Sequence, residues 1–114
     1  MKLIIKKLTK ISLKEKSQII KLKNQEWKYT YKKQNDWIKK NIKRNDINIF
    51  LKIGKKIVGY NLLRLRKFQV NEDKTPRYYY YFDTLIIDKG FRNKNLSNII
   101  MKKSIQIISD KAFG

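Results

Sequence analysis

The chain has 114 residues, of which 29 are Lys or Arg and 9 are Asp or Glu, so its formal net charge is +20. It contains no His and no Cys, which excludes disulfide bonds, zinc fingers, Cys nucleophiles and His-based catalytic triads. A hydrophobic fraction of 41%, with seven Tyr, five Phe and two Trp, argues against disorder. The length predicts one domain over residues 1–114.

The sequence contains no segment that resembles a membrane span or a secretion signal. The first apolar run, residues 3–5, is interrupted by lysines and is too short for a signal peptide. No other stretch approaches the roughly 20 apolar residues that a membrane helix needs. We therefore expect a cytoplasmic protein without a membrane partner.

The positive charge has two interpretations. It comes from 24 Lys and only five Arg, beside 18 Ile and 10 Asn, a bias toward residues with A/T-rich codons. A nucleic-acid-binding face usually concentrates its charge and favours Arg, whereas Lys is spread here over nearly every segment. This pattern favours a solvated lysine surface with non-specific attraction to polyanions at low salt. A basic nucleic-acid-binding module remains the alternative.

The first part of the chain predicts a strand followed by two helices. Residues 2–8 form a short apolar and basic run that is typical of a strand. Ser12 and Glu15 match a capping box, so a helix should begin there. Apolar residues spaced for one helical stripe follow at Leu13, Ile19, Ile20, Leu22 and Trp27. The same spacing at Tyr31, Gln34, Ile38 and Ile42 predicts a second helix over residues 32–44.

The second part predicts three strands and a final helix. Alternating apolar residues over 47–53 predict a half-buried strand, with Asn48, Phe50 and Lys52 on its other face. A turn at residues 54–56 leads into a longer antiparallel strand over 57–68, and a polar loop over 71–77 follows. Residues 78–88 predict the third strand, and helical spacing predicts a helix from Leu96 to about Ser109.

The junction between the last strand and the last helix, residues 82–97, carries the most chemical information. A strand that leads through a short basic turn into a helix exposes the first N–H groups of that helix, which form an anion site with the helix dipole. Arg92 and Lys94 add positive charge beside those groups. A pyrophosphate would suit such a site.

This junction resembles that of the GNAT superfamily of acyl-CoA-dependent N-acyltransferases, in which a Leu-x-Val strand precedes an Arg-x-x-Gly-x-Gly/Ala loop that opens a helix. Here Leu85-Ile86-Ile87 resembles the strand, and Arg92-Asn93-Lys94-Asn95-Leu96-Ser97 resembles the loop. Residues 57–60 are also similar to a strand phrase of that family. The resemblance implies an α/β (α+β) fold whose mixed, mainly antiparallel sheet follows the order strand-helix-helix-strand-strand-strand-helix.

The resemblance implies transfer of an acetyl group from acetyl-CoA to a primary amine of a small-molecule or peptide acceptor. It assigns acetyl-CoA binding to nine residues: Leu85, Ile86, Ile87, Arg92, Asn93, Lys94, Asn95, Leu96 and Ser97. Asn95 and Ser97 stand where the family has small residues, and Asn tolerates the left-handed backbone that Gly adopts.

Asp83 is the candidate for the base that removes the proton of the acceptor ammonium. Because the chain has no His, the base must be a carboxylate, a Tyr or water. Asp83 lies two residues before Leu85 on the predicted strand; the alternative is a solvent-facing or Arg-paired carboxylate. The sequence leaves the role of the aromatic residues 78–81 open, because they could line an acceptor pocket or pack against the rest of the sheet. Arg64 and Arg66 are expected to be surface residues on one face of their strand.

The family continues beyond the point that corresponds to Gly114, by roughly 40 residues at typical element lengths. The resemblance therefore implies a C-terminally incomplete domain, either a fragment or a chain that pairs with another chain. The strand over residues 78–88 would then present an apolar edge through which the chain could self-associate. A non-catalytic remnant of the fold is the remaining alternative.

Overall fold

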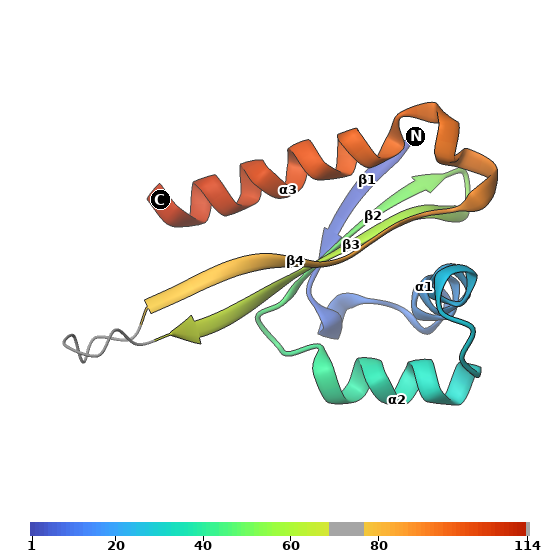
Figure 1. The fold of residues 1–114 in the computed structure, drawn as a ribbon, viewed down its shortest axis with the longest axis horizontal. Helices are drawn as coiled ribbons and strands as arrows, with labels where there is room; N and C mark the ends of the chain where they lie inside the picture. Colours follow the sequence, from blue (N-terminus) through green and yellow to red (C-terminus); the bar gives the residue numbers. More distant parts are fainter. Residues whose placement is uncertain (69–76, 114) are drawn as a thin grey trace.

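A four-stranded sheet separates two helices on one face from a third helix on the other face in the computed structural model of the chain, which describes residues 1–68 and 77–113 (Figure 1). The strands are β1 (Lys2–Lys6), β2 (Ile47–Ile53), β3 (Lys56–Phe68) and β4 (Arg77–Ile87). The helices are α1 (Leu13–Glu26), α2 (Tyr31–Asn41) and α3 (Leu96–Phe113), with short 3-10 helices η1 (Leu8–Lys10) and η2 (Lys89–Lys94). The predicted order of elements is confirmed.

The strands follow the order β1-β2-β3-β4, and every neighbouring pair is antiparallel. This confirms a mainly antiparallel sheet, and no parallel pair occurs among the described strands. β4 lies at one edge of this sheet and pairs only with β3 there. The predicted loop over residues 71–77 lies outside the described residues, except that Arg77 already begins β4.

The capping box predicted for α1 is present. The Ser12 hydroxyl accepts a hydrogen bond from the Glu15 N–H at 3.1 Å, and the Ser12 N–H donates to Glu15 Oε1 at 2.9 Å. These two bonds satisfy backbone donors at the start of the helix, so the sequence fixes where α1 begins.

Two details of the predicted helices are wrong. Leu13 is 86% exposed and Trp27 is also exposed, because Leu13 lies at the first turn and α1 ends before Trp27. The buried stripe consists of Ile19, Ile20 and Leu22 instead. α2 ends at Asn41 rather than at residue 44, because Ile42 is extended and the Asp46 carboxylate accepts from the Lys43 N–H at 2.8 Å.

Strand β2 is buried on both faces, which corrects the half-buried strand expected from its alternation. Phe50 packs with α1 and α2, whereas Ile49 and Leu51 pack with α3. Asn48 is also fully buried, and it accepts a hydrogen bond from the Tyr60 hydroxyl at 2.5 Å. Helices on both sides of the sheet therefore create two separate cores.

Gly59 lets α3 approach the sheet closely. A Cβ atom at Gly59 would lie 2.6 Å from Ile100 Cδ1 and 3.0 Å from Ile87 Cδ1, closer than packed carbon atoms allow. α3 itself extends to Phe113, beyond the predicted end near Ser109. Among the residues that the structure describes, no helix is long and apolar enough to cross a membrane.

Candidate functional site

A bulge in β4 determines where the Asp83 side chain points. Leu62 pairs with Thr84 and the next residue, Leu63, pairs with Phe82, so Asp83 is the extra residue in the ladder. Side chains normally alternate between the faces of a strand, but the bulge places Asp83 and Thr84 on the same side, toward α1 and α2. Without the bulge, Asp83 would share the opposite face with Leu85.

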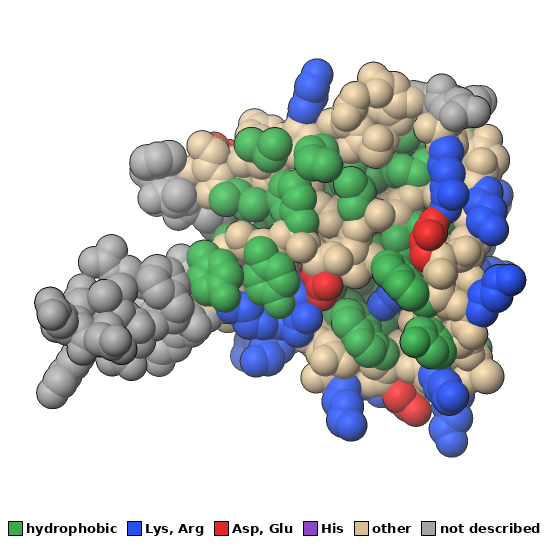
Figure 2. Space-filling view, viewed as in Figure 1, with side chains coloured by type: hydrophobic (Ala, Val, Ile, Leu, Met, Phe, Trp, Pro, Cys, Tyr) green, Lys and Arg blue, Asp and Glu red, His purple; other side chains and the backbone are tan. Residues whose placement is uncertain are grey.

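A pocket of about 410 Å³ lies between this bulge and the two helices. β4 contributes Asp83 and Thr84 to its lining. The rest of the lining comes from α1, α2 and their connection, namely Lys23, Trp27, Tyr29, Lys33, Gln34 and Trp37. Hydrophobic side chains gather on this face of the molecule over α3 and β4, and a smaller group lies near α1 and its connection to α2 (Figure 2).

Gln34 holds the two helices together at the pocket. Its amide group donates to Asn24 Oδ1 at 3.0 Å and to the Trp27 carbonyl at 3.2 Å, and the side chain is almost fully buried. The Thr30 hydroxyl caps α2 by accepting from the Lys33 N–H at 3.2 Å. The pocket therefore has a fixed wall on its helical side.

Lys23 brings a buried positive charge to the pocket. Its Nζ atom lies 3.7 Å from the centre of the Trp37 ring, in a cation–π contact, and the residue is only 5% exposed. Burial lowers the pKa of Lys23 to about 8, and the nearby Asp83 charge offsets only part of that effect. Lys23 is therefore still largely protonated at neutral pH.

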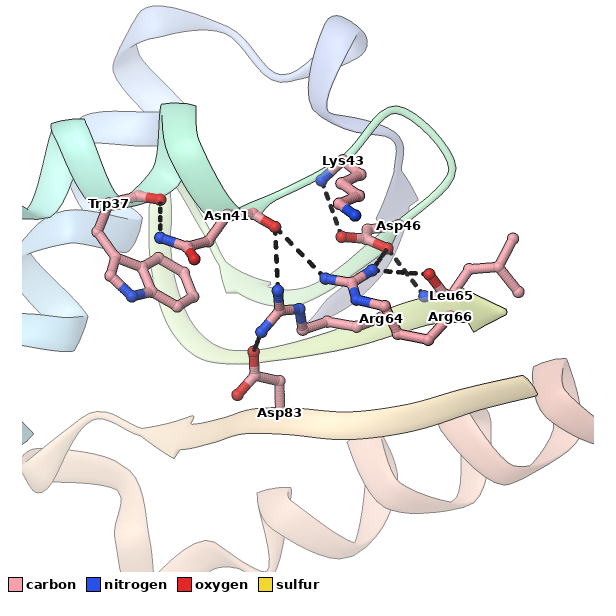
Figure 3. Close-up of polar contacts among 8 residues, drawn as sticks. All are labelled: Trp37, Asn41, Lys43, Asp46, Arg64, Leu65, Arg66 and Asp83. Atoms are coloured by element: carbon pink, nitrogen blue, oxygen red, sulfur yellow. Dashed lines mark hydrogen bonds and ion pairs between the residues drawn. The ribbon is translucent and has the colours of Figure 1, made fainter. Parts of the chain in front are cut away.

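Asp83 is held by Arg64 (Figure 3). Arg64 Nη1 donates to Asp83 Oδ2 at 2.9 Å, and Arg64 Nη2 donates to the Asn41 carbonyl at the end of α2 at 3.2 Å. Asp83 is thus an Arg-paired carboxylate, as one sequence interpretation had it. The hydrogen bond from Arg64 uses Oδ2 of Asp83, and 24% of the Asp83 side chain remains exposed.

Arg66 extends the same network, so neither arginine is a free surface group. Arg66 Nη1 donates to the fully buried Asp46 carboxylate at 3.0 Å, which also accepts from the Leu65 N–H at 2.8 Å. Figure 3 shows both guanidinium groups converging on the end of α2. The network therefore connects β4, β3 and the α2–β2 connection, which corrects the surface role expected for Arg64 and Arg66.

The aromatic run on β4 does not line the pocket within its described part. The Tyr81 ring lies beneath the guanidinium groups of Arg64 and Arg66, at 5.8 Å and 5.9 Å. Tyr80 packs against the core on the α3 side. Packing is therefore the better interpretation for Tyr80 and Tyr81.

Asn95 at the start of α3 has the left-handed backbone expected for it. Its φ of 60° and ψ of 23° make it the non-Gly residue with positive φ among those described. Its side-chain oxygen accepts from the Asn98 amide group. Leu96 and Ser97 begin α3 directly after it, so the first N–H groups of α3 lie where the sequence predicts an anion site.

The turn before Asn95 is fixed to α1. The Asp88 carboxylate accepts from the Gly90 N–H at 2.9 Å and from Gln25 Nε2 at 3.0 Å, and the Lys89 N–H donates to Gln25 Oε1 at 3.0 Å. Burial alone would raise the pKa of Asp88, but the hydrogen bonds from Gln25 and Gly90 and the charge of Lys56 hold it below its usual value. Asp88 therefore stays ionised and caps η2.

Arg92 makes contacts within the protein at this junction. Its Nε donates to the Ile87 carbonyl at 3.2 Å, and Nη2 forms an ion pair with Glu26. Asn93 and Lys94 complete η2. An anion at the junction would compete with Glu26 for Arg92, because Glu26 holds the guanidinium by charge.

The three strand residues assigned to acetyl-CoA differ in burial. Ile86 and Ile87 are buried in the two cores, and Leu85 packs partly against the α3 side. Their side chains thus belong to the protein interior, and only their backbone groups at the edge of β4 are suited to bind a ligand.

Sequence reasoning missed most of the pocket. The approach of Trp27, Tyr29 and Trp37 to Asp83 depends on how α1 and α2 pack on the sheet, and the bulge depends on the pairing with β3. The aromatic residues between and within the two helices were the available signal, since exposed large aromatics often mark binding surfaces.

The fold is similar to solved acetyltransferase structures. The aminoglycoside 6'-N-acetyltransferase AAC(6')-IG from Acinetobacter haemolyticus superposes with a TM-score of 0.73 at 9% identity, over 98% of this chain and 74% of that chain. A GNAT family acetyltransferase from Staphylococcus aureus gives a TM-score of 0.71 at 17% identity, over 96% and 80%. An aminoglycoside 6'-N-acetyltransferase complexed with coenzyme A gives 0.70 at 12% identity, over 96% and 57%.

No protein-family model matches the sequence, and no curated protein matches it in sequence. The similarity is therefore one of structure. The chain has the fold of the GNAT superfamily, as the strand-to-helix junction predicted.

Proposed function

We propose that the chain is an N-acyltransferase that moves an acetyl group from acetyl-CoA to a primary amine. One observation carries the proposal: in a chain with this fold, Asn95 has a left-handed backbone conformation between β4 and α3. The glycine in the corresponding loop of the GNAT superfamily would adopt the same conformation. The proposal includes a single GNAT-like domain over residues 1–114 and a cytoplasmic location.

The junction and the pocket lie on the same strand. Asp83 and Ile87 are four residues apart on β4, a distance of about 13 Å along an extended strand. In this proposal a ligand held by the start of α3 extends along the edge of β4 toward the pocket. Acetyl-CoA, when bound, would supply an acyl group activated as a thioester.

Asp83 is the residue that we assign to the proton transfer. A primary amine is mostly protonated at neutral pH and must lose a proton before its nitrogen can act as a nucleophile. Asp83 lines the pocket, and the hydrogen bond from Arg64 uses its Oδ2 atom. Arg64 orients the carboxylate through Oδ2, so that one oxygen is fixed and the other can accept the proton.

The substitution Asp83→Asn tests this assignment. The Asn side chain can still accept a hydrogen bond from Arg64, but it cannot take the proton, so we expect acetyl transfer to slow by about 100-fold or more. The rate is measured as thiol release from acetyl-CoA with a panel of primary amines. Asp36→Asn, an exposed aspartate on α2, is the matched control and should leave the rate unchanged. A wild-type rate in Asp83→Asn would contradict the assignment.

A basic nucleic-acid-binding module is the second candidate, supported by the net charge of +20. Lys and Arg side chains are scattered around the outline of the face in Figure 2. This candidate predicts binding to nucleic acid that persists at physiological salt, whereas attraction through scattered charge alone falls steeply with salt. Titration of a duplex at several salt concentrations separates the two.

A further inference from the structure

Lys23 has no role in the proposed proton transfer, although its charge lies in the pocket wall. Its ammonium group has no hydrogen-bond or ion-pair partner among the described residues, and its observed contact is the face of Trp37. A buried ammonium group loses its hydration, and a cation–π contact restores only part of that loss. The Nζ atom therefore has donor capacity that an anionic group in the pocket could use.

The charge balance of the pocket favours an anion beside Lys23. Lys33 contributes a second positive charge, and Asp83, the one carboxylate among the described residues of the lining, is already paired with Arg64. Two lysines thus outnumber the one carboxylate named in this lining, in a chain whose net charge is +20. A ligand with several positive charges would be repelled, because like charges in a partly desolvated site are unfavourable.

The aromatic lining favours a flat apolar body in the ligand. Trp27, Tyr29 and Trp37 supply three ring systems to a pocket of about 410 Å³. A volume of this size is typical of sites for small molecules. Asp83 offers the place for an ammonium group, and Lys23 offers the place for an anionic group.

We infer that this pocket binds an amine that also carries an anionic group on a flat apolar body, which is the chemistry of an aromatic amino acid. Lys23 holds the anionic group, the aromatic side chains of the lining contact the body, and Asp83 holds the ammonium group. The inference rests on the proposed function, because it names the acceptor class for that reaction. It departs from the aminoglycosides, which are polyamines, named for two of the similar structures.

Three related probes test the inference without acetyl-CoA. Phenylalanine carries both charged groups, 2-phenylethylamine lacks the carboxylate, and 3-phenylpropionate lacks the amine. Binding is followed by the fluorescence of Trp27 and Trp37 in physiological salt. We expect phenylalanine to bind most tightly and 2-phenylethylamine to bind at least about tenfold more weakly, since a charge-assisted hydrogen bond is lost.

Substitutions of Lys23 locate the anion. Lys23→Met should remove the preference for phenylalanine over 2-phenylethylamine, and Lys23→Arg, which keeps the charge, should retain it. Lys14→Met removes an equal charge from an exposed position on α1 and should leave all three affinities unchanged. The inference is overturned if no probe binds, if 2-phenylethylamine binds as tightly as phenylalanine, or if Lys23→Met keeps the preference.

The failure of this inference can be told apart from failure of the proposed function. Acetyl-CoA binding together with tighter binding of a polyamine such as sisomicin than of phenylalanine overturns the inference and leaves the proposed function standing. Lys23-dependent phenylalanine binding without acetyl transfer to any amine supports the binding site and overturns the proposed function.

Discussion

Arg64 Nη1 lies 2.9 Å from Asp83 Oδ2, and the same guanidinium group reaches the Asn41 carbonyl at the end of α2. One side chain therefore joins the bulge of β4 to the helix that forms the opposite wall of the pocket. The pocket keeps its shape because both walls are tied to β3. This arrangement makes Arg64 a positioning residue for Asp83.

Substitution of Arg64 should destabilise the protein measurably. Arg64→Met removes the ion pair to Asp83 and the hydrogen bond to Asn41, so the free energy of unfolding should fall by about 1 to 3 kcal/mol. Arg44→Met, at an exposed arginine, should change it by less than about 0.5 kcal/mol. Urea unfolding measures both, and equal stability of the two variants would show that the Arg64 contacts contribute nothing.

Glu15 should make stability depend on pH in the acid range. Burial alone would raise the pKa of Glu15, but the hydrogen bond from Ser12 and the ammonium groups of Lys6 and Lys52 lower it to about 2. The folded state thus binds the proton less tightly than the unfolded state does. The stabilisation from Glu15 is complete above its ordinary pKa of about 4.5 and disappears as the pH falls toward 2.

The variant Glu15→Gln isolates this effect. At pH 7 it should lower the free energy of unfolding by about 1 to 2 kcal/mol, because both lysine ion pairs are lost. The difference from the wild type should shrink between pH 4.5 and pH 2 in acid unfolding curves. Asp110→Asn, at an exposed position on α3, should follow the wild type throughout. A difference that stays constant down to pH 2 would contradict the ion pairs.

The order of elements could be predicted from local signals, whereas the pocket could not. The capping box at Ser12 and the changes between helical and alternating spacing are contained in short segments. The bulge at Asp83 depends instead on the register between β3 and β4, and the burial of Lys23 depends on how α1 packs beside α2. Residues far apart in the sequence decide these features, and a single sequence does not reveal how they pair.

Burial of β2 on both faces could not be predicted from its sequence either, because it depends on helices that are distant in the sequence. The alternation over residues 47–53 predicts one polar face, but α3 and the α1–α2 pair cover opposite sides of the sheet. Asn48 is tolerated inside because Tyr60 donates to it and its own amide donates to the Lys6 carbonyl at 3.2 Å. The left-handed backbone conformation at Asn95, in contrast, was predictable, since few residue types other than Gly tolerate it.

The left-handed backbone of Asn95 should be visible in stability. Asn95→Ala should lower the free energy of unfolding by about 1 kcal/mol, because a Cβ group without a polar side chain is strained at φ of 60°. Asn95→Gly should change it by less than about 0.5 kcal/mol. Asn35→Ala, inside α2, should be neutral or stabilising because Ala is the better helix former. If Asn95→Ala and Asn95→Gly lowered the free energy of unfolding equally, backbone strain at this position would not be the cause.

The contact of Gly59 with α3 predicts a specific compensation. Gly59→Ala should cost about 1 to 3 kcal/mol through the contact with Ile100 Cδ1. Ile100→Val removes that carbon atom and should cost about 1 kcal/mol by itself. The double variant should be more stable than the sum of the two losses predicts, as a double-mutant cycle in urea would measure. If the losses in the free energy of unfolding were strictly additive, the Ala side chain at position 59 would not contact Ile100.

The most direct test of the central claim is a calorimetric titration of the 114-residue chain with acetyl-CoA in physiological salt, which screens non-specific charge attraction. The proposed function predicts one saturable site, weakened about tenfold by Arg92→Ala and unaffected by Arg44→Ala. No saturable binding by the folded wild-type chain at millimolar acetyl-CoA, or equal affinity in Arg92→Ala and Arg44→Ala, would contradict acyl-CoA binding at the junction of β4 and α3.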